Sequence, residues 1–251
     1  MRRFEGRTAV VTGGSRSIGR ATALALASEG ANVVVNYRGD REAADATIDE
    51  IARAGGVAVA VQADVADRRQ AAQLIDSAIE HFGHIELLVN NAAVLQRTAV
   101  LDIHPDEWDR VIQTNLTGAF SCAQLAARHM ARRKEGAIVN VTSINDSRAR
   151  IGLTHYSVSK AGLTMLTRQM ALELADEGVR VNAVALGLFE TDMNRERLAD
   201  SQIRHEQLKQ IPLGLIGAPE DAVGPILFLL SDAARLITGS VLVVDAGRSL
   251  Q

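Results

Sequence analysis

Two residues four positions apart, Tyr156 and Lys160, carry the side chains needed for proton transfer. If the segment 154–176 is helical, both lie on one face of that helix, with Cβ atoms about 5–6 Å apart. A phenol ordinarily has a pKa near ~10 and is a poor acid–base catalyst at neutral pH. A neighbouring ammonium favours the phenolate and is expected to lower that pKa. The pair is therefore a candidate general acid, although the same spacing is common between surface residues of ordinary helices.

The elements that must position this pair follow an alternating rhythm along the 251-residue chain. Short β-branched runs alternate with longer amphipathic segments, and unbroken apolar runs such as 33–35 indicate strands that are buried on both faces. The pattern predicts an α/β fold, a doubly wound parallel sheet with helices on both faces. The expected strands are 8–11, 32–36, 57–62, 87–90, 137–142, 180–185 and 240–244, and the expected helices are 17–29, 41–54, 67–82, 106–133, 154–176 and 219–231. Nothing in the sequence indicates a second domain, so 1–251 is expected to be one domain, and its least regular segment, about 187–218, is expected to be a substrate lid.

Composition excludes several classes of function. Apolar residues make up 47% of the chain and the net charge is −3, so no general attraction to nucleic acid or to an anionic membrane is expected. The only cysteine, Cys122, cannot form a disulfide within the chain, and no signal-peptide pattern is present, which together predict a cytoplasmic protein. The six histidines show no ligand-like pairing, so no metal site is expected.

A glycine-containing turn follows the first expected strand and leads into a helix, the context in which backbone amides bind a pyrophosphate. The second strand ends in Asn36 rather than in the acidic residue that would bind a free ribose 2′-hydroxyl. Arg16 and Arg38 could instead bind a 2′-phosphate, and Asp64 could accept a hydrogen bond from an adenine amino group. We therefore expect NADP to be preferred, with NAD a possible alternative.

Taken together, these motifs resemble those of the short-chain dehydrogenases/reductases, and the resemblance runs nearly from end to end. It implies a single-domain Rossmann fold with seven strands, NAD or NADP as cofactor, and usually four subunits joined through the long helices 106–133 and 154–176. It also implies a catalytic tetrad of Asn115, Ser143, Tyr156 and Lys160. In the family Tyr156 would donate the proton, Lys160 would hold the nicotinamide ribose, Ser143 would bind the carbonyl oxygen, and Asn115 would position a water that links Lys160 to solvent.

The resemblance also assigns binding residues. The expected cofactor contacts are Gly13, Ser15, Arg16, Ser17, Ile18, Gly19, Asn36, Tyr37, Arg38, Asp64, Val65, Asn91, Ala92, Ala93, Tyr156, Lys160, Gly187, Phe189 and Thr191. The expected substrate contacts are Ser143, Ile144, Asn145, Gln96, Leu153, Tyr156, Leu188 and Met193.

Four positions depart from the family pattern: Ser17, Ala93 and Ala246 replace glycines, and Leu186 replaces a proline. The first matters most, because a glycine there lets the backbone approach the pyrophosphate. A serine at this position is expected either to crowd the phosphates, to cap the helix, or to donate its hydroxyl to a phosphate.

The substrate is less well defined by the sequence. The lid carries acidic and basic residues in a mixture that indicates no substrate charge, so we expect a ketone reductase or a secondary alcohol or sugar dehydrogenase, similar to glucose 1-dehydrogenases. The closest alternative is a 3-oxoacyl-carrier-protein reductase, which the segment 187–193 resembles. A minor alternative is a catalytically silent scaffold that senses nucleotide.

Overall fold

The computed structural model describes residues 2–251 as one seven-stranded, fully parallel sheet. The strands are β1 (Thr8–Val11), β2 (Asn32–Tyr37), β3 (Val57–Gln62), β4 (Leu87–Asn90), β5 (Gly136–Ser143), β6 (Val179–Leu186) and β7 (Val241–Val244). Their order across the sheet is β3-β2-β1-β4-β5-β6-β7, so the strand order reverses beside β1, between β1 and β4. The predicted doubly wound parallel sheet is confirmed.

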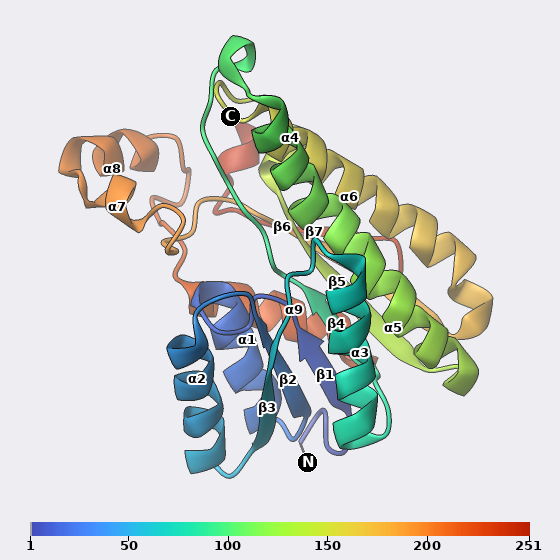
Figure 1. Ribbon diagram of the computed structural model, residues 1–251. Coiled ribbons are helices and arrows are strands. Elements are labelled where there is room, and N and C mark those ends of the chain that lie inside the picture. The colour runs from blue at the N-terminus through green and yellow to red at the C-terminus, as the bar shows by residue number, and fades with distance from the viewer. Residues whose placement is uncertain (1) are drawn as a thin grey trace.

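Helices cover both faces of the sheet (Figure 1). One face is covered by α1 (Ser17–Ser28), α2 (Arg41–Arg53) and α9 (Val223–Leu230). The other is covered by α3 (Arg68–Phe82), α5 (Ala119–Arg133) and α6 (Thr154–Glu173), and α4 (Pro105–Ile112) extends this layer beyond the sheet. No helix within residues 2–251 is long and apolar enough to cross a membrane.

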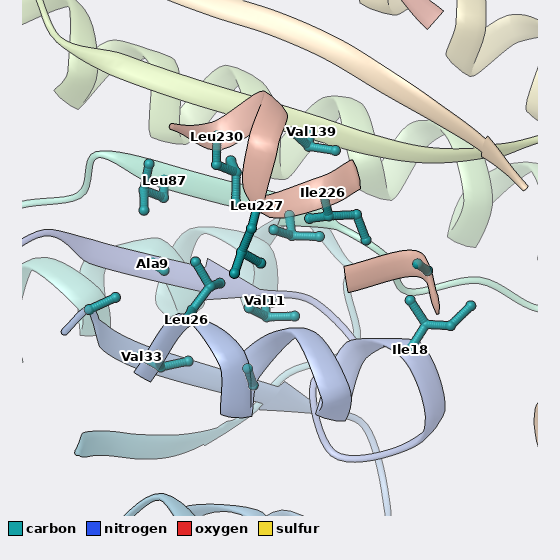
Figure 2. Close-up of a cluster of buried hydrophobic side chains, with 14 of the residues drawn as sticks. Ala9, Val11, Ile18, Leu26, Val33, Leu87, Val139, Ile226, Leu227 and Leu230 are labelled. Carbon is teal, nitrogen blue, oxygen red and sulfur yellow. The ribbon is translucent and has the colours of Figure 1, made fainter. Parts of the chain in front are cut away.

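Alternate residues of the strands pack into opposite layers. Val33 and Val35 belong to the hydrophobic core under α1 and α9, whereas Val34 belongs to the core under α3 and α5. Figure 2 shows the first of these cores, where Leu26 of α1 and Leu227 of α9 lie beside Ala9 and Val11 of β1. This two-sided burial is why β2 reads as an unbroken apolar run rather than as an alternating one.

The predicted helix 106–133 is interrupted in the structure. A π-helical segment, Gln113–Gly118, joins α4 to α5. A π-helical turn widens the helix by one residue, and such turns occur frequently at functional sites. Here the widened segment contains Asn115, and it ends at Gly118, where a Cβ atom would lie 2.8 Å from the backbone oxygen of Val65. The turn therefore brings this segment against the β3–α3 loop more closely than a side chain would allow.

Strand β6 is longer than predicted and reaches Leu186, which pairs with Ser143 at the end of β5. A leucine, unlike proline, keeps its backbone N–H and can continue a strand inside a sheet. The C-terminal helix predicted at 219–231 begins instead as a 3₁₀ turn, Pro219–Ala222, and continues as α9.

The segment 187–218 holds two short helices, α7 (Arg195–Ala199) and α8 (Ser201–Leu208), which project away from the sheet (Figure 1). Its two ends lie side by side, because Phe189 forms an isolated parallel bridge with Gly217. Two backbone hydrogen bonds hold this bridge, from Gly217 N to Leu188 O at 3.0 Å and from Glu190 N to Gly217 O at 2.8 Å. The segment therefore leaves the body of the domain and returns to it at one place, which the bridge holds together.

Candidate active site

The ends of β5 and β6 and the start of α6 bring the predicted catalytic residues to the carboxyl edge of the sheet. Ser143 is the last residue of β5 and is buried. Tyr156 lies in the first turn of α6, whose N-terminal Leu153 donates its backbone N–H to Arg150 O at 3.2 Å. Ser143 Oγ accepts from Asn145 N at 3.2 Å, and the Ser143 side chain is near enough to Tyr156 to act on the pKa of the phenol. The two groups that would contact a carbonyl oxygen are therefore adjacent.

The pKa of Tyr156 lies above its ordinary value, chiefly because the side chain is buried. The Ser143 side chain and the positive charge of Arg97 act in the opposite direction, and burial outweighs them. The expectation that Lys160 lowers this pKa is wrong in this structure, because the groups that oppose burial are Ser143 and Arg97. Tyr156 is consequently a protonated phenol at neutral pH, ready to donate.

Lys160 lies one helical turn beyond Tyr156 and is almost fully buried. Its Nζ donates to the backbone oxygen of Val141 at 2.8 Å and lies 5.7 Å from the centroid of the Tyr156 ring. Burial lowers the pKa of Lys160 to about 8, so the ammonium is still the main form at neutral pH but gives up its proton readily. The Lys160 side chain is therefore a candidate proton donor to the Tyr156 phenolate.

Asn115 is buried in the π-helical turn, and its side chain is fully engaged. Its Oδ1 accepts from Val94 N at 2.8 Å, and its Nδ2 donates to Val94 O at 2.9 Å and to Ser159 Oγ at 3.1 Å. These bonds tie the loop after β4 to α6. The structure therefore gives the Asn115 side chain a positioning role and leaves it no free donor for the predicted water.

The glycine turn after β1 is shaped for close approach to an anion. Gly13 has φ +60°, and a Cβ on Gly19 would lie 2.1 Å from Gly13 O, so neither position accepts a side chain freely. Helix α1 then begins at Ser17 with no side-chain cap on its first amides. Uncapped N–H groups at a helix N-terminus suit a pyrophosphate, and the residues present fit a dinucleotide cofactor.

A set of hydrogen bonds fixes this turn against its neighbours. Asn36 is buried, and its Oδ1 accepts from Gly13 N at 3.1 Å while its Nδ2 donates to Ala63 O at 2.9 Å. Asn91 Nδ2 donates to Thr12 O at 2.9 Å and to Gly13 O at 3.1 Å. Both asparagines therefore hold the turn in place through their side chains.

The remaining predicted cofactor residues surround this turn and the nicotinamide side of the sheet. Arg38 is exposed, and the Arg16 side chain is 61% exposed and lies 3.7 Å from Asp40. Asp64 uses Oδ1 to accept from Ala66 N at 3.0 Å. The others are half-buried or buried along the strand ends and the lid base: Ser15, Ile18, Tyr37, Val65, Ala92, Ala93, Gly187, Phe189 and Thr191. Of these, Phe189 packs against Gly217 at the lid base. A Cβ atom on Gly217 would lie 2.7 Å from the Phe189 ring.

Ser17 does not cap helix α1, which is one of the three expectations made for it. Its backbone has φ +47°, the left-handed region that explains the glycine usual at this position. Its Oγ donates to Asp192 Oδ2 at 3.0 Å and accepts from Asp192 N at 3.2 Å. In this structure the Ser17 side chain joins the glycine turn to the lid.

The predicted substrate residues divide into a buried and an open group. Ile144 and Leu153 are buried beside Ser143 and Tyr156, and the buried Oδ1 of Asn145 has no partner within residues 2–251. Leu188 lies half-buried at the lid base, and the Gln96 side chain accepts a hydrogen bond from Arg110. Met193 is 49% exposed on the lid.

Sequence reasoning missed three groups. Thr12 bridges β1 to the loop after β4, since its Oγ1 accepts from Asn91 N at 2.9 Å and from Ala92 N at 3.0 Å. Ser159 Oγ accepts a hydrogen bond from Asn115 Nδ2 and donates one to the Tyr156 carbonyl. Its position three residues after Tyr156 in the sequence could have indicated this role, because residues at that spacing are neighbours on a helix. Arg97, which acts on Tyr156, left no such signal.

His155 is fully buried next to Tyr156, and its Nε2 lies 2.8 Å from Glu107 Oε1 on α4. The same carboxylate oxygen accepts from Thr98 Oγ1 at 2.6 Å. These contacts connect the start of α6 to the loop that carries Arg97.

Comparison with known proteins agrees with this geometry. Residues 13–249 match a family model described as enoyl-(acyl carrier protein) reductase. The chain is 42% identical over 248 residues to 3beta-hydroxysteroid dehydrogenase 1 of Eggerthella lenta, covering 98% of this chain and 95% of that protein. It is 42% identical over 241 residues to a 3-oxoacyl-[acyl-carrier-protein] reductase of Staphylococcus aureus, covering 96% and 97%.

Among solved structures, the chain is similar to a gluconate 5-dehydrogenase from Burkholderia cenocepacia in complex with NADP and tartrate. The TM-score is 0.94 at 34% identity, and the match covers 100% of this chain and 98% of the other. A putative short-chain alcohol dehydrogenase from Sinorhizobium meliloti matches with a TM-score of 0.94 at 39% identity, covering 98% of each chain.

Proposed function

Because the chain belongs to the short-chain dehydrogenase/reductase family, we propose that it transfers a hydride between NADP and a small ketone or secondary alcohol. The observation that carries this proposal is the convergence of Ser143, Tyr156 and Lys160 at the sheet edge that also carries the glycine turn. Its relatives are named as dehydrogenases and reductases that act on hydroxyl and keto groups.

When bound, the nicotinamide supplies or accepts the hydride. Ser143 and Tyr156 together hold the carbonyl oxygen by hydrogen bonds, which stabilises the negative charge that develops on it. Tyr156 then gives its phenolic proton to that oxygen as general acid. Lys160 Nζ lies 5.7 Å from the centroid of the Tyr156 ring, and its pKa of about 8 suits it to return a proton to the phenolate at neutral pH.

We propose NADP rather than NAD as the preferred cofactor. Arg16 and Arg38 flank the end of β2 with no acidic residue at Asn36 to repel a 2′-phosphate, and related structures contain NADP. The one competing charge is Asp40, 3.7 Å from the Arg16 guanidinium. Both arginines are exposed enough to turn toward a phosphate.

Turnover of a ketone panel with NADPH and with NADH tests the function and the cofactor together. The panel includes small ketones, oxo acids and an acyl thioester. The Tyr156→Phe variant should lose at least ~10²-fold in kcat, because only the proton donor is removed, while the Kd for NADPH stays close to that of the parent protein. Near-native turnover by the Phe variant would overturn the proton-donor role. Tight NADPH binding without turnover of any carbonyl would instead favour the nucleotide-sensing scaffold.

A second candidate is reduction of 3-oxoacyl chains on an acyl carrier protein, as in the Staphylococcus aureus relative. An acidic carrier requires exposed basic residues near the site. Arg128 and Arg132 border an open groove of about 520 Å³ between α5 and α6, but Glu173 and Glu177 border the same groove. This mixed charge favours small-molecule substrates, and the acyl-thioester member of the panel separates the two.

We further propose a cytoplasmic homotetramer. Its only cysteine is free and buried, as suits a reducing compartment. Helix α6 carries exposed apolar side chains seven residues apart, Val158, Met165 and Leu172, which form one stripe along its outer face. A stripe of this kind supports contact with a second copy through the long helices, and exposed Leu242 and Val243 on the edge strand β7 support a second contact.

A further inference from the structure

Five arginines lie close enough for their charges to act on one another, and one of them, Arg97, also acts on Tyr156. We term the set the arginine cluster: Arg97, Arg148, Arg150, Arg197 and Arg248. They come from the loop after β4, the loop after β5, the lid helix α7 and the C-terminal segment. Burial, together with the positive charges of the other four, lowers the pKa of Arg248 to about 10. Residues far apart in the sequence therefore bring like charges to one place.

Within residues 2–251, the hydrogen bonds of the arginine cluster go to neutral acceptors. Arg248 is 2% exposed, its Nη2 donates to the side-chain oxygens of Gln207 and Gln210, and its Nε has no partner in the described chain. Arg150 Nη2 donates to Gln210 Oε1 at 2.8 Å, and Arg148 donates to the backbone oxygen of Arg248. Amide oxygens orient guanidinium groups without cancelling their charge.

No member of the arginine cluster forms an ion pair with a carboxylate of residues 2–251. The lid carboxylates Glu190 and Asp192 pair with other arginines, Arg204 at 2.8 Å and Arg195 at 3.0 Å. Asp245, three residues before Arg248, accepts from the backbone amides of Gly247 and Ser249, and it is near enough to Arg148 for that charge to help lower the pKa of its carboxyl group without forming an ion pair. Two of the lid carboxylates are thus paired with other arginines, and Arg197 has no carboxylate partner within residues 2–251.

The arginine cluster adjoins the reacting atoms. Arg97 lies close enough to Tyr156 for its charge to act on the phenol. The residue after it, Thr98, donates its backbone N–H to Gly152 O at 3.1 Å. Arg148 donates its own backbone N–H to Ile144 O at 3.2 Å, directly after Ser143. The segments that hold the catalytic side chains are also those that hold the guanidinium groups.

Resting on the function proposed above, we propose that the substrate carries an anionic group beside the reacting carbon, and that the arginine cluster binds it. Uncompensated, partly buried cations with a free N–H are matched by a group that supplies charge and paired acceptor oxygens, as a carboxylate or a phosphate does. The position next to Tyr156 places that group on the substrate itself, a few bonds from the hydroxyl or keto carbon. The substrate class is a small hydroxy acid and its oxo acid.

The decisive assay compares an oxo acid with its own methyl ester, at equal concentration and with saturating NADPH. The pair differs in the anionic group alone, and the acid should have a kcat/KM higher by about tenfold or more, as a charge-assisted hydrogen bond implies. A phosphate monoester of the matching hydroxy ketone distinguishes the two anion types. Equal kcat/KM for acid, ester and phosphate would overturn the anion proposal while leaving the oxidoreductase function standing.

Arg197→Gln should remove most of the preference for the acid over the ester. The matched control is Arg195→Gln, which makes the same change in charge on the same helix at a residue that pairs with Asp192 and lies 65% exposed. The control should keep the preference. If both variants lose it equally, general charge rather than the arginine cluster sets it, and the proposal fails.

Binding of tartrate to the NADP complex gives a readout that does not depend on turnover. Isothermal titration should show a Kd for the parent protein that weakens by about tenfold or more in Arg197→Gln and not in Arg195→Gln. Absence of tartrate binding, together with turnover of neutral ketones, would overturn the proposal and assign the cluster to contact between copies of the chain. Tartrate binding without turnover of any carbonyl would support the anion site and overturn the oxidoreductase function.

Discussion

At the scale of single residues, the site depends on two opposite effects of burial. Burial raises the pKa of the Tyr156 phenol and lowers that of the Lys160 ammonium, so each group favours its neutral form. At neutral pH the phenol keeps its proton and the lysine is near its midpoint of about 8. These pKa shifts suit Tyr156 to act as a proton donor and Lys160 to return the proton to it. They do not suit a permanently ionised phenolate beside a permanently charged lysine.

This arrangement predicts a pH-dependent stability. Lys160 has a pKa of about 8 in the folded chain and 10.5 as a free side chain, so between these values the unfolded chain binds more protons. Stability relative to a Lys160→Met variant should therefore rise from pH 8 to pH 10, by on the order of 2–3 kcal/mol at most. Above pH 10 the raised pKa of Tyr156 acts in the opposite direction, because the unfolded chain then loses a proton that the folded chain keeps.

Denaturant unfolding at pH 7.5, 9 and 10 measures this difference. Lys209→Met is the control, since Lys209 is exposed and should give no slope over the same range. A constant gap between the parent protein and Lys160→Met at all three pH values would show that the buried lysine does not titrate in this window.

At the scale of elements, Ser17 and Asp192 couple the glycine turn to the lid by two hydrogen bonds. A double-mutant cycle of Ser17→Ala and Asp192→Ala should show a coupling free energy of about 0.5–1.5 kcal/mol in denaturant unfolding. Ser17→Gly should be more stable than Ser17→Ala, because glycine adopts φ +47° without strain. Additive single variants would mean that the contact contributes nothing to stability.

The strands could be predicted because each is an apolar run bounded by polar or glycine residues. The family resemblance assigned Ser143 and Tyr156, which the structure places at the end of β5 and in the first turn of α6. The π-helical turn could not, since it depends on Asn115 reaching Val94 and on Gly118 approaching Val65. The Ser17–Asp192 contact spans 175 residues and has no local pattern. The arginine cluster could not be predicted for the same reason, because its members are far apart in the sequence and no local pattern links them.

At the scale of the whole molecule, the outer face of α6 is the feature that one copy of the chain leaves unexplained. Met165 is 58% exposed at the centre of the Val158–Leu172 stripe. Met165→Glu places a charge in the proposed contact and should shift the mass measured by light scattering from that of a tetramer to that of a smaller species. Ala52→Glu, at an exposed position of α2 on the other face of the sheet, serves as a control for one added negative charge outside the stripe. An unchanged mass for Met165→Glu would place the subunit contacts elsewhere.

The paired base of the lid has a consequence for how this protein can be re-engineered. Phe189 and Gly217 sit next to each other on the chain's own scaffold, so the 27 residues between them leave and return at one place. A segment from another member of the family, cut at the same two points, can be exchanged without altering the spacing of any strand. Such an exchange keeps β5 and α6 in place, but it also replaces the lid residues that contact Ser17 and Arg248, so those two contacts must be restored in the new segment.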